Sequence, residues 1–210
     1  MRSLALSLLL AAGSLTVSGC HTDHGFLRAA GGARQDAPDA DQANDAALFL
    51  AGLPGRAQSP YKALEQDAAW QQHAREMEAL WDKFEVGREP AMRRFAQSEL
   101  PAGDSRGRAV WYPFSGADAL TMLTFFPGRK TYVMAALEPP GLVPEPNRFP
   151  AETLDQELPA IAGTLRSLLQ KSFFVTREMD HQLRGQVADG VVEPLLILLA
   201  RSGYHINGFE

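Results

Sequence analysis

Four side chains beside turn signals are the candidates for chemistry in this sequence: Ser115, Asp118, Glu138 and His205. A serine hydroxyl can act as a nucleophile if a histidine takes its proton, so Ser115 and His205 form one possible pair. Two carboxylates in one crevice can bind a cation or act as acid and base, which applies to Asp118 and Glu138. The sequence does not set the distances among these four side chains, so the catalytic site is a hypothesis.

Ser115 and Asp118 also have a structural interpretation. Residues 115–118 read Ser-Gly-Ala-Asp, a pattern in which the serine caps a helix and the aspartate lies at its positive end. A nucleophile elbow requires G-x-S-x-G, whereas Pro113 and Ala117 occupy the two outer glycine positions here. Helix capping is therefore the preferred interpretation, a ligand contact comes second and a nucleophile third.

The elements around this turn predict the fold class. Residues 109–114 and 131–137 are short apolar runs that indicate strands, and residues 117–126 between them indicate a helix. Two strands joined by a helix should lie parallel with a right-handed crossover. We therefore expect an α/β (or α+β) fold with a small, mostly parallel sheet, in which residues 109–138 form a central βαβ unit flanked by helices. The Ser115 turn would lie at the carboxyl end of a strand, where α/β folds usually bind ligands.

Helical patterns precede and follow this unit. They cover residues 60–87, 89–100, 153–171 and 191–200. Ser59 and Pro60 have the residue types expected at the cap and first position of a helix. An aromatic and methionine stripe ending at Phe84 is interpreted as core rather than as a ligand groove, and Phe95 on the next helix should also point inward. Pro159 should kink or split its helix, and residues 204–209 predict a final strand.

Composition excludes several kinds of function. The chain has 210 residues and a formal net charge of −5, without the basic patch that nucleic-acid binding requires. Its one cysteine, Cys20, rules out an intrachain disulfide. His21 and His24 have no third ligand nearby, so no metal site is expected, and no motif indicates a cofactor.

The amino terminus indicates an export signal. Met1 and Arg2 are followed by an apolar stretch over residues 4–17 that is too short to span a bilayer as a helix. Val-Ser-Gly-Cys at residues 17–20 resembles the lipobox of bacterial lipoproteins. The resemblance implies cleavage before Cys20, a diacylglycerol on its thiol and frequent acylation of its amine, as by palmitate. Because residue 21 is His rather than Asp, the outer membrane is favoured, with the protein facing the periplasm.

Three segments follow from this interpretation. Residues 1–19 are a lipoprotein signal peptide, residues 20–58 a flexible tether rich in Ala, Gly, Asp and Gln, and residues 59–210 a single α/β domain. Within the tether, residues 46–53 are more apolar and indicate a short helix that Gly52, Pro54 and Gly55 would end. If about 25 residues of the tether are flexible, their root-mean-square extension is roughly 25–30 Å.

A second resemblance covers most of residues 109–210. Residues 112–118 read YPFSGAD, residues 125–127 read FFP, and Tyr132 is followed by LEP at residues 137–139. These motifs resemble an uncharacterised family of bacterial, often lipid-anchored proteins with the pattern Y-P-F-S-G-P-D, F-F-P, Y, L-E-P, to which no activity is attached. The chain departs from that pattern at Ala117. Family members continue with further strands, so the domain is either a truncated version or ends on an edge strand.

The sequence thus predicts a lipid-anchored envelope protein of unknown biochemical activity. The preferred hypothesis is a periplasm-facing module that binds an envelope protein or a small ligand, needs no cofactor and touches the membrane through the lipid on Cys20. The alternative is a hydrolase-like enzyme with its site at the Ser115 turn. An enzyme requires Ser115, Asp118, Glu138 and a histidine to converge within hydrogen-bond reach.

Overall fold

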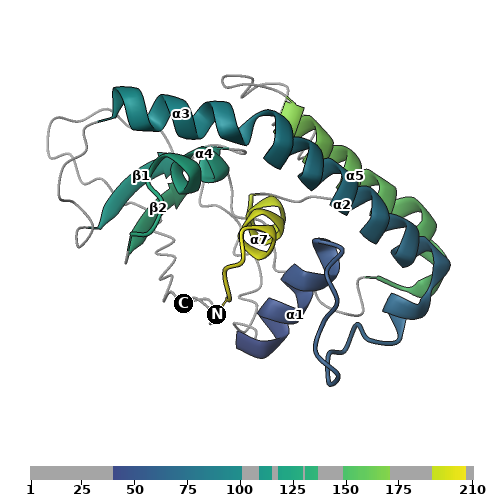
Figure 1. The fold of residues 1–210 in the computed structure, drawn as a ribbon. Coiled ribbons are helices and arrows are strands. Elements are labelled where there is room, and N and C mark those ends of the chain that lie inside the picture. Colours follow the sequence, from purple (N-terminus) through teal and green to yellow (C-terminus); the bar gives the residue numbers. More distant parts are fainter. Residues whose placement is uncertain are drawn as a thin grey trace, which may run out of the picture.

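Helices dominate the protein. The computed structural model describes residues 40–100, 109–114, 118–129, 131–136, 149–170 and 191–206. The helices are α1 (Ala40–Leu50), α2 (Ala68–Gly87), α3 (Glu89–Glu99), α4 (Asp118–Phe125), α5 (Leu154–Gln170) and α7 (Val192–Arg201), with short 3₁₀ turns at Leu64–Gln66 and Ala151–Thr153 (Figure 1). Strands β1 (Val110–Phe114) and β2 (Tyr132–Ala136) form a small parallel sheet. The fold is therefore of the α/β or α+β class, as predicted.

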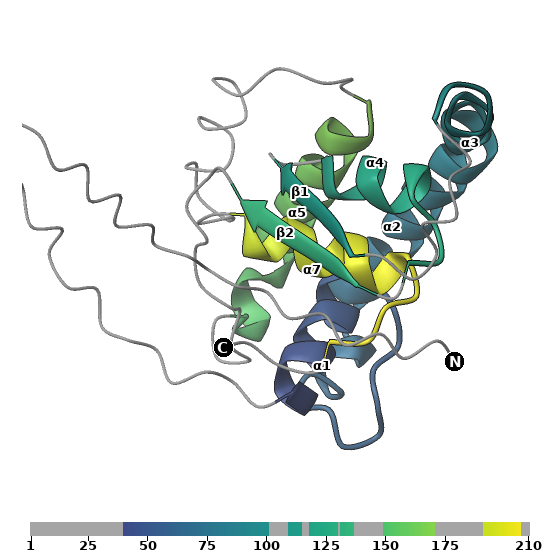
Figure 2. The same cartoon turned by 90° about the vertical axis from the view of Figure 1, so that its left-hand side faces the viewer.

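The sheet pairs β1 and β2 in parallel, with α4 between them in the chain. Val110 lies opposite Tyr132, and the Val110 N–H donates to the Thr131 carbonyl at 3.0 Å. All three elements lie where the sequence predicts a strand, a helix and a strand. Figure 2 shows the sheet in front of α4, α5 and α7, so helices cover one of its faces. Tyr132 and Met134 are buried on that covered side, because alternate side chains of a strand point to the same face.

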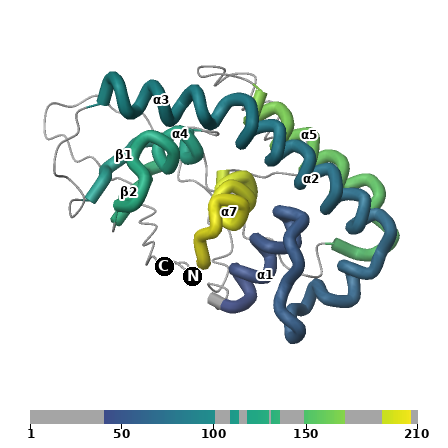
Figure 3. The backbone as a smooth tube through the Cα atoms, viewed as in Figure 1, coloured from purple at the N-terminus to yellow at the C-terminus, as the bar shows by residue number. Residues whose placement is uncertain are grey.

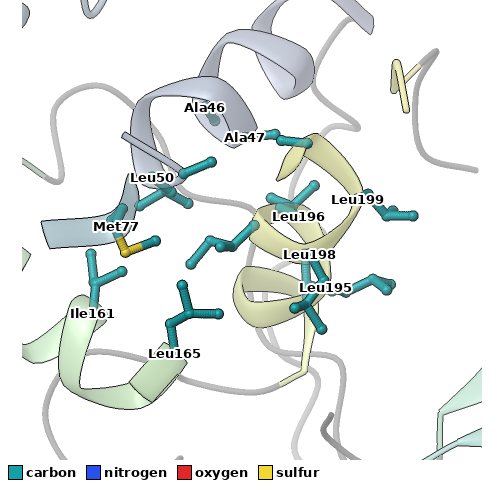
Figure 4. Close-up of a cluster of buried hydrophobic side chains, with 14 of the residues drawn as sticks. Ala46, Ala47, Leu50, Met77, Ile161, Leu165, Leu195, Leu196, Leu198 and Leu199 are labelled. Atoms are coloured by element: carbon teal, nitrogen blue, oxygen red, sulfur yellow. The ribbon is translucent and has the colours of Figure 1, made fainter. Parts of the chain in front are cut away.

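The largest part of the core lies among the helices. α2 and α5 run side by side, and α1 and α7 pack together beneath them (Figure 3). Figure 4 shows buried side chains from all four helices pointing toward one another. α7 is buried over most of its surface, and it lies where the sequence predicts a helix at residues 191–200. The sheet lies at one end of this helical body (Figure 1).

Helix α1 belongs to the core, which corrects the predicted tether. Its buried side chains are Ala43, Asn44, Asp45, Ala46, Ala47, Phe49 and Leu50. The Phe49 ring lies 4.7 Å from the Tyr61 ring and 5.6 Å from the Phe149 ring, so the helix is held by aromatic contacts to distant parts of the chain. Folded structure thus begins by residue 40, and the predicted boundary at residue 59 is too late.

The start of α2 differs from the prediction. The Ser59 hydroxyl accepts the N–H of Tyr61 at 3.2 Å, but it caps a turn rather than a long helix. Asp67 is the residue that caps α2, because its side chain accepts the N–H of Ala69 at 2.7 Å. The prediction that this helix begins at residue 60 is therefore wrong by eight residues. Ser59 and Asp67 are both residue types that cap helices, so the sequence alone did not show which of them precedes α2.

The predicted core stripe of α2 is confirmed. Trp70, Met77, Trp81 and Phe84 are all buried. The prediction for α3 is wrong in part, because Phe95 is 51% exposed; its ring packs against that of Phe125 on α4, at a centroid distance of 5.6 Å.

Two predictions for the last third of the chain need correction. α5 is one continuous helix through Pro159, so the proline does not split it; the buried Leu158 and Ile161 on either side hold the helix in the core. Residues 204–206 are not in a strand. The Tyr204 N–H instead donates to the Leu199 carbonyl at 3.0 Å, which closes the end of α7.

Candidate functional site

The predicted site lies at the junction of β1 and α4. β1 ends at Phe114 and α4 begins at Asp118, so the junction has the strand-to-helix geometry that the sequence predicts. Ser115 and Glu138 lie outside the described residues, as do Cys20 and the signal peptide. Of the four candidates for chemistry, Asp118 and His205 can therefore be placed. Asp118 is half-buried in the first turn of α4, where the helix dipole favours a negative charge.

Tyr112 lies near this junction and was not among the four candidates from the sequence. Its phenol is half-buried on β1, and burial, followed by the negative charge of Asp118, raises the pKa of Tyr112 above its ordinary value of 10.0. The phenol therefore stays protonated at neutral pH and can donate a hydrogen bond. Its place at the head of the YPFSGAD motif is the signal that could have identified it.

His205 lies at a different part of the fold. It is exposed, and its neighbour Ile206 donates its backbone N–H to the side-chain oxygen of Asn44 on α1 at 3.2 Å. This bond holds the segment after α7 against α1. Figures 1 and 2 both show α7 between α1 and α4. Asp118 begins α4, whereas His205 follows α7, next to the residue that is bonded to α1. Among the described residues, Asp118 therefore interacts with Tyr112, and no interaction with the predicted histidine, His205, is found.

A second candidate site is the face of the sheet that the helices do not cover. We call it the outer face, and it is formed by Trp111, Pro113, Val133 and Ala135. Strand pairing places Trp111 opposite Val133 and Pro113 opposite Ala135, so the four side chains lie together. Trp111 is 74% exposed, Pro113 and Ala135 are exposed and Val133 is half-buried. Trp70 and Trp81, the other two tryptophans of the chain, are each only 7% exposed. The outer face carries no charge and one large exposed aromatic ring.

His73 has a structural role. It is one of three side chains that satisfy the last carbonyls of α1, whose helical partners are missing at a helix end. Trp70 Nε1 donates to the Phe49 carbonyl (3.1 Å), His73 Nε2 to the Leu50 carbonyl (2.8 Å) and Arg201 Nε to the Ala51 carbonyl (2.8 Å). Burial lowers the pKa of His73 below its ordinary value of 6.5. This cluster fastens α1 to α2 and α7.

A group of charges holds the loop after α1. Arg56 donates two hydrogen bonds to the buried carboxylate of Asp45, at 2.9 and 2.8 Å, and pairs with Asp41 at 2.5 Å. The hydrogen bonds, first that to Asp45, raise the pKa of Arg56. The buried carboxylate of Glu65 pairs with Lys62 at 2.7 Å. Each of these charges is paired with a residue of α1 or of the segment that follows it, so the group is structural.

Metal ligands do not gather in the described ranges: no three side chains of His, Asp, Glu or Cys there lie close enough together to hold an ion. Among the same residues, no helix has both the length and the hydropathy needed to cross a bilayer.

Comparison with known proteins gave no relative. No model of a protein family matches the chain, and no match was found to a curated protein or to a solved structure.

Proposed function

We propose that this protein is a lipid-anchored component of the bacterial envelope and that its folded domain is an interaction module rather than an enzyme. The observation that carries the interaction role is the outer face, where Trp111 is 74% exposed among uncharged neighbours. Exposed tryptophan is unusual on a surface without a partner and common at contact sites. His205 lies next to a residue that is bonded to α1, whereas Asp118 begins α4, and this placement supports a role without catalysis.

The lipid anchor rests on the lipobox at residues 17–20, and the location at the outer membrane, facing the periplasm, rests on His21. Membership of the lipoprotein family with the Y-P-F-S-G-P-D pattern is part of the same proposal. So is the finer description of the fold, in which β1, α4 and β2 form the βαβ unit that presents the junction and the outer face.

Cell fractionation tests the anchor. In a bacterial host, the wild-type protein should sediment with the membranes, and the Cys20→Ala variant should lose its lipid and stay in an unprocessed or soluble form. A Cys20→Ala protein that fractionates and migrates as wild type would refute the anchor. Ser18→Ala, which keeps a small residue two positions before Cys20, is the matched control and should behave as wild type.

A hydrolase at the Ser115 turn is the second candidate, favoured by the placement of Tyr112 on β1 near the start of α4, where the charge of Asp118 adds to burial in raising the pKa of Tyr112. This candidate predicts covalent labelling of Ser115 by a fluorophosphonate, with labelling abolished in Ser115→Ala. The interaction module predicts that the wild-type protein and the variant are equally unlabelled.

A further inference from the structure

We propose that the outer face docks on the lipid surface to which the protein is anchored, with the Trp111 indole at the boundary between headgroups and acyl chains. This inference rests on the proposed lipid anchor and names the partner of the outer face. Its basis is the composition of that face, the backbone of β1 and the length of chain between Cys20 and α1.

The composition of the outer face suits a membrane interface. The indole of Trp111 has an apolar body and one N–H donor, and tryptophan concentrates where apolar and aqueous phases meet. Pro113, Val133 and Ala135 surround it with apolar surface and no ionised group. A chain whose formal net charge is −5 would be repelled by anionic lipid over much of its surface, and the outer face adds no negative charge to that repulsion.

The backbone of β1 disfavours a partner strand. Val110 donates its N–H to Thr131 next to β2, and backbone groups alternate in direction along a strand. Those of Trp111 and Pro113 therefore point to the opposite edge of β1, which no described strand covers. Proline has no N–H to donate, so a strand added at that edge would lose a ladder bond. At this edge of β1, a contact through the face of the sheet is therefore favoured over the addition of a strand.

The size of the outer face disfavours a second protein. A stable interface buries about 800 Å² on each partner and involves roughly 20–30 residues a side. Four side chains supply much less. A membrane contact needs no such area, because the acyl chains provide most of the attachment at ~0.8 kcal/mol per buried CH₂.

The tether keeps the outer face within reach of the bilayer. α1 begins at Ala40, so the sequence predicts a flexible linker from Cys20 to that residue. A linker of about 20 residues has a root-mean-square extension of about 25 Å. A folded domain of this size has a radius of gyration of about 15 Å. Any face of the domain can therefore turn to the membrane, and the one with an exposed tryptophan gains most by doing so.

Fluorescence of the lipidated protein tests the docking. The full mature chain is reconstituted in vesicles of phosphatidylethanolamine and phosphatidylglycerol, either unbrominated or brominated in the acyl chains. We expect brominated lipid to quench the tryptophan emission. We also expect the emission maximum in unbrominated vesicles to lie at a shorter wavelength than that of the same protein after it has been released enzymatically from its lipid into detergent-free buffer. Because Trp70 and Trp81 are buried, Trp111→Phe should lose the quenching.

Two matched variants locate the contact. Ala135→Glu puts a negative charge on the outer face at an exposed position and should abolish the quenching while the protein stays on the vesicles. Val86→Glu makes a similar change at a valine that is 83% exposed on α2 and should leave the quenching unchanged. Near-ultraviolet circular dichroism checks that both variants are folded.

The outcomes separate the two proposals. A mass spectrum without acyl chains on Cys20 overturns the anchor and, with it, the docking. Acylated protein whose emission is not quenched overturns the docking alone. A blue shift without quenching means that protein covers the face, either another copy or a segment of this chain, and also overturns the docking, as does quenching that survives Ala135→Glu.

Discussion

At the scale of single residues, the fold depends on positions whose role is set by backbone geometry. Gly52 follows the end of α1 with φ of +64°, in the left-handed region that a residue with a Cβ enters at a cost. A Cβ at this position would lie 2.8 Å from the Cα of Ala74 in α2. Gly52 therefore allows both the turn and the close packing of α1 on α2.

Replacing Gly52 by alanine should lower the free energy of unfolding by about 1–3 kcal/mol, because the left-handed conformation and the contact with Ala74 are both penalised. Gly128→Ala is the control. Its φ is +74°, yet nothing lies within 4 Å of a Cβ there, so it should cost only the conformational part. Denaturant unfolding compares the two variants, and equal losses would contradict the close packing of α1 on α2.

His73 should make stability depend on pH. Its pKa in the folded protein lies below 6.5, chiefly because it is buried, while the carbonyls of Leu50 and Leu158 and the charge of Glu76 partly oppose that effect and Arg201 adds to it. In the unfolded chain the ring titrates near pH 6.5. Below that pH the unfolded state binds more protons, so stability should fall as the pH falls below about 6.5 and should level off below the folded pKa.

Chemical unfolding between pH 5 and 8 measures this dependence. The His73→Gln variant keeps a donor for the Leu50 carbonyl but cannot titrate, so its unfolding free energy should vary less with pH over this window. Wild-type and variant curves that run parallel would show that His73 does not carry the effect.

At the scale of elements, the sequence predicted what local pattern controls and missed what distant contacts control. The stripe of α2, the apolar run of α7 and the segments β1, α4 and β2 were all recognisable from periodicity and turn residues. α1 was recognisable only in its second half, as a short helix within the predicted tether, because its first residues are small or polar and resemble a linker. Asn44 and Asp45 are buried there only because Ile206 and Arg56 provide their partners.

The candidate site was predictable in the same limited sense. The turn signals placed Asp118 at the start of α4, which the structure bears out. No local pattern could place His205, since its position depends on the bond between Ile206 and Asn44, 162 residues apart in the chain. Tyr112 was missed because its interaction with Asp118 arises from the strand-to-helix geometry rather than from its residue type.

The attachment of α7 to α1 should depend on Arg201. Its side chain is 3% exposed, donates to the Ala51 carbonyl at 2.8 Å and pairs with Glu78 on α2. Arg201→Met should lower the free energy of unfolding by about 1–3 kcal/mol, since a buried charged hydrogen bond is lost. Arg93→Met is the control, because Arg93 is 52% exposed and pairs only with Glu89 on its own helix; it should change stability by less than about 0.5 kcal/mol. Similar losses in thermal unfolding would contradict the role of Arg201.

At the scale of the whole molecule, the protein is a helical body with a small sheet at one end, and the outer face of that sheet is uncharged (Figure 1). The body includes α1, whose aromatic contacts reach Tyr61 and Phe149. The body therefore includes residues from 40 onward that the sequence assigned to the tether.

Two internal deletions test this boundary. Removing residues 21–39 should leave the unfolding transition unchanged, whereas removing residues 21–58 should abolish cooperative unfolding because the core loses Phe49 and Leu50. Calorimetry and near-ultraviolet circular dichroism provide the readout. A cooperative transition after the longer deletion would restore the boundary at residue 59.

The central claim is that a lipid on Cys20 holds this body at the envelope membrane, where the outer face makes its contact. Its most direct test is the intact mass of the protein extracted from bacterial membranes, followed by fragmentation of its first peptide. The account predicts a chain that begins at Cys20 and carries diacylglycerol and, on its amine, a further acyl chain. A mature chain that begins elsewhere, or that begins at Cys20 without acyl mass, would contradict it.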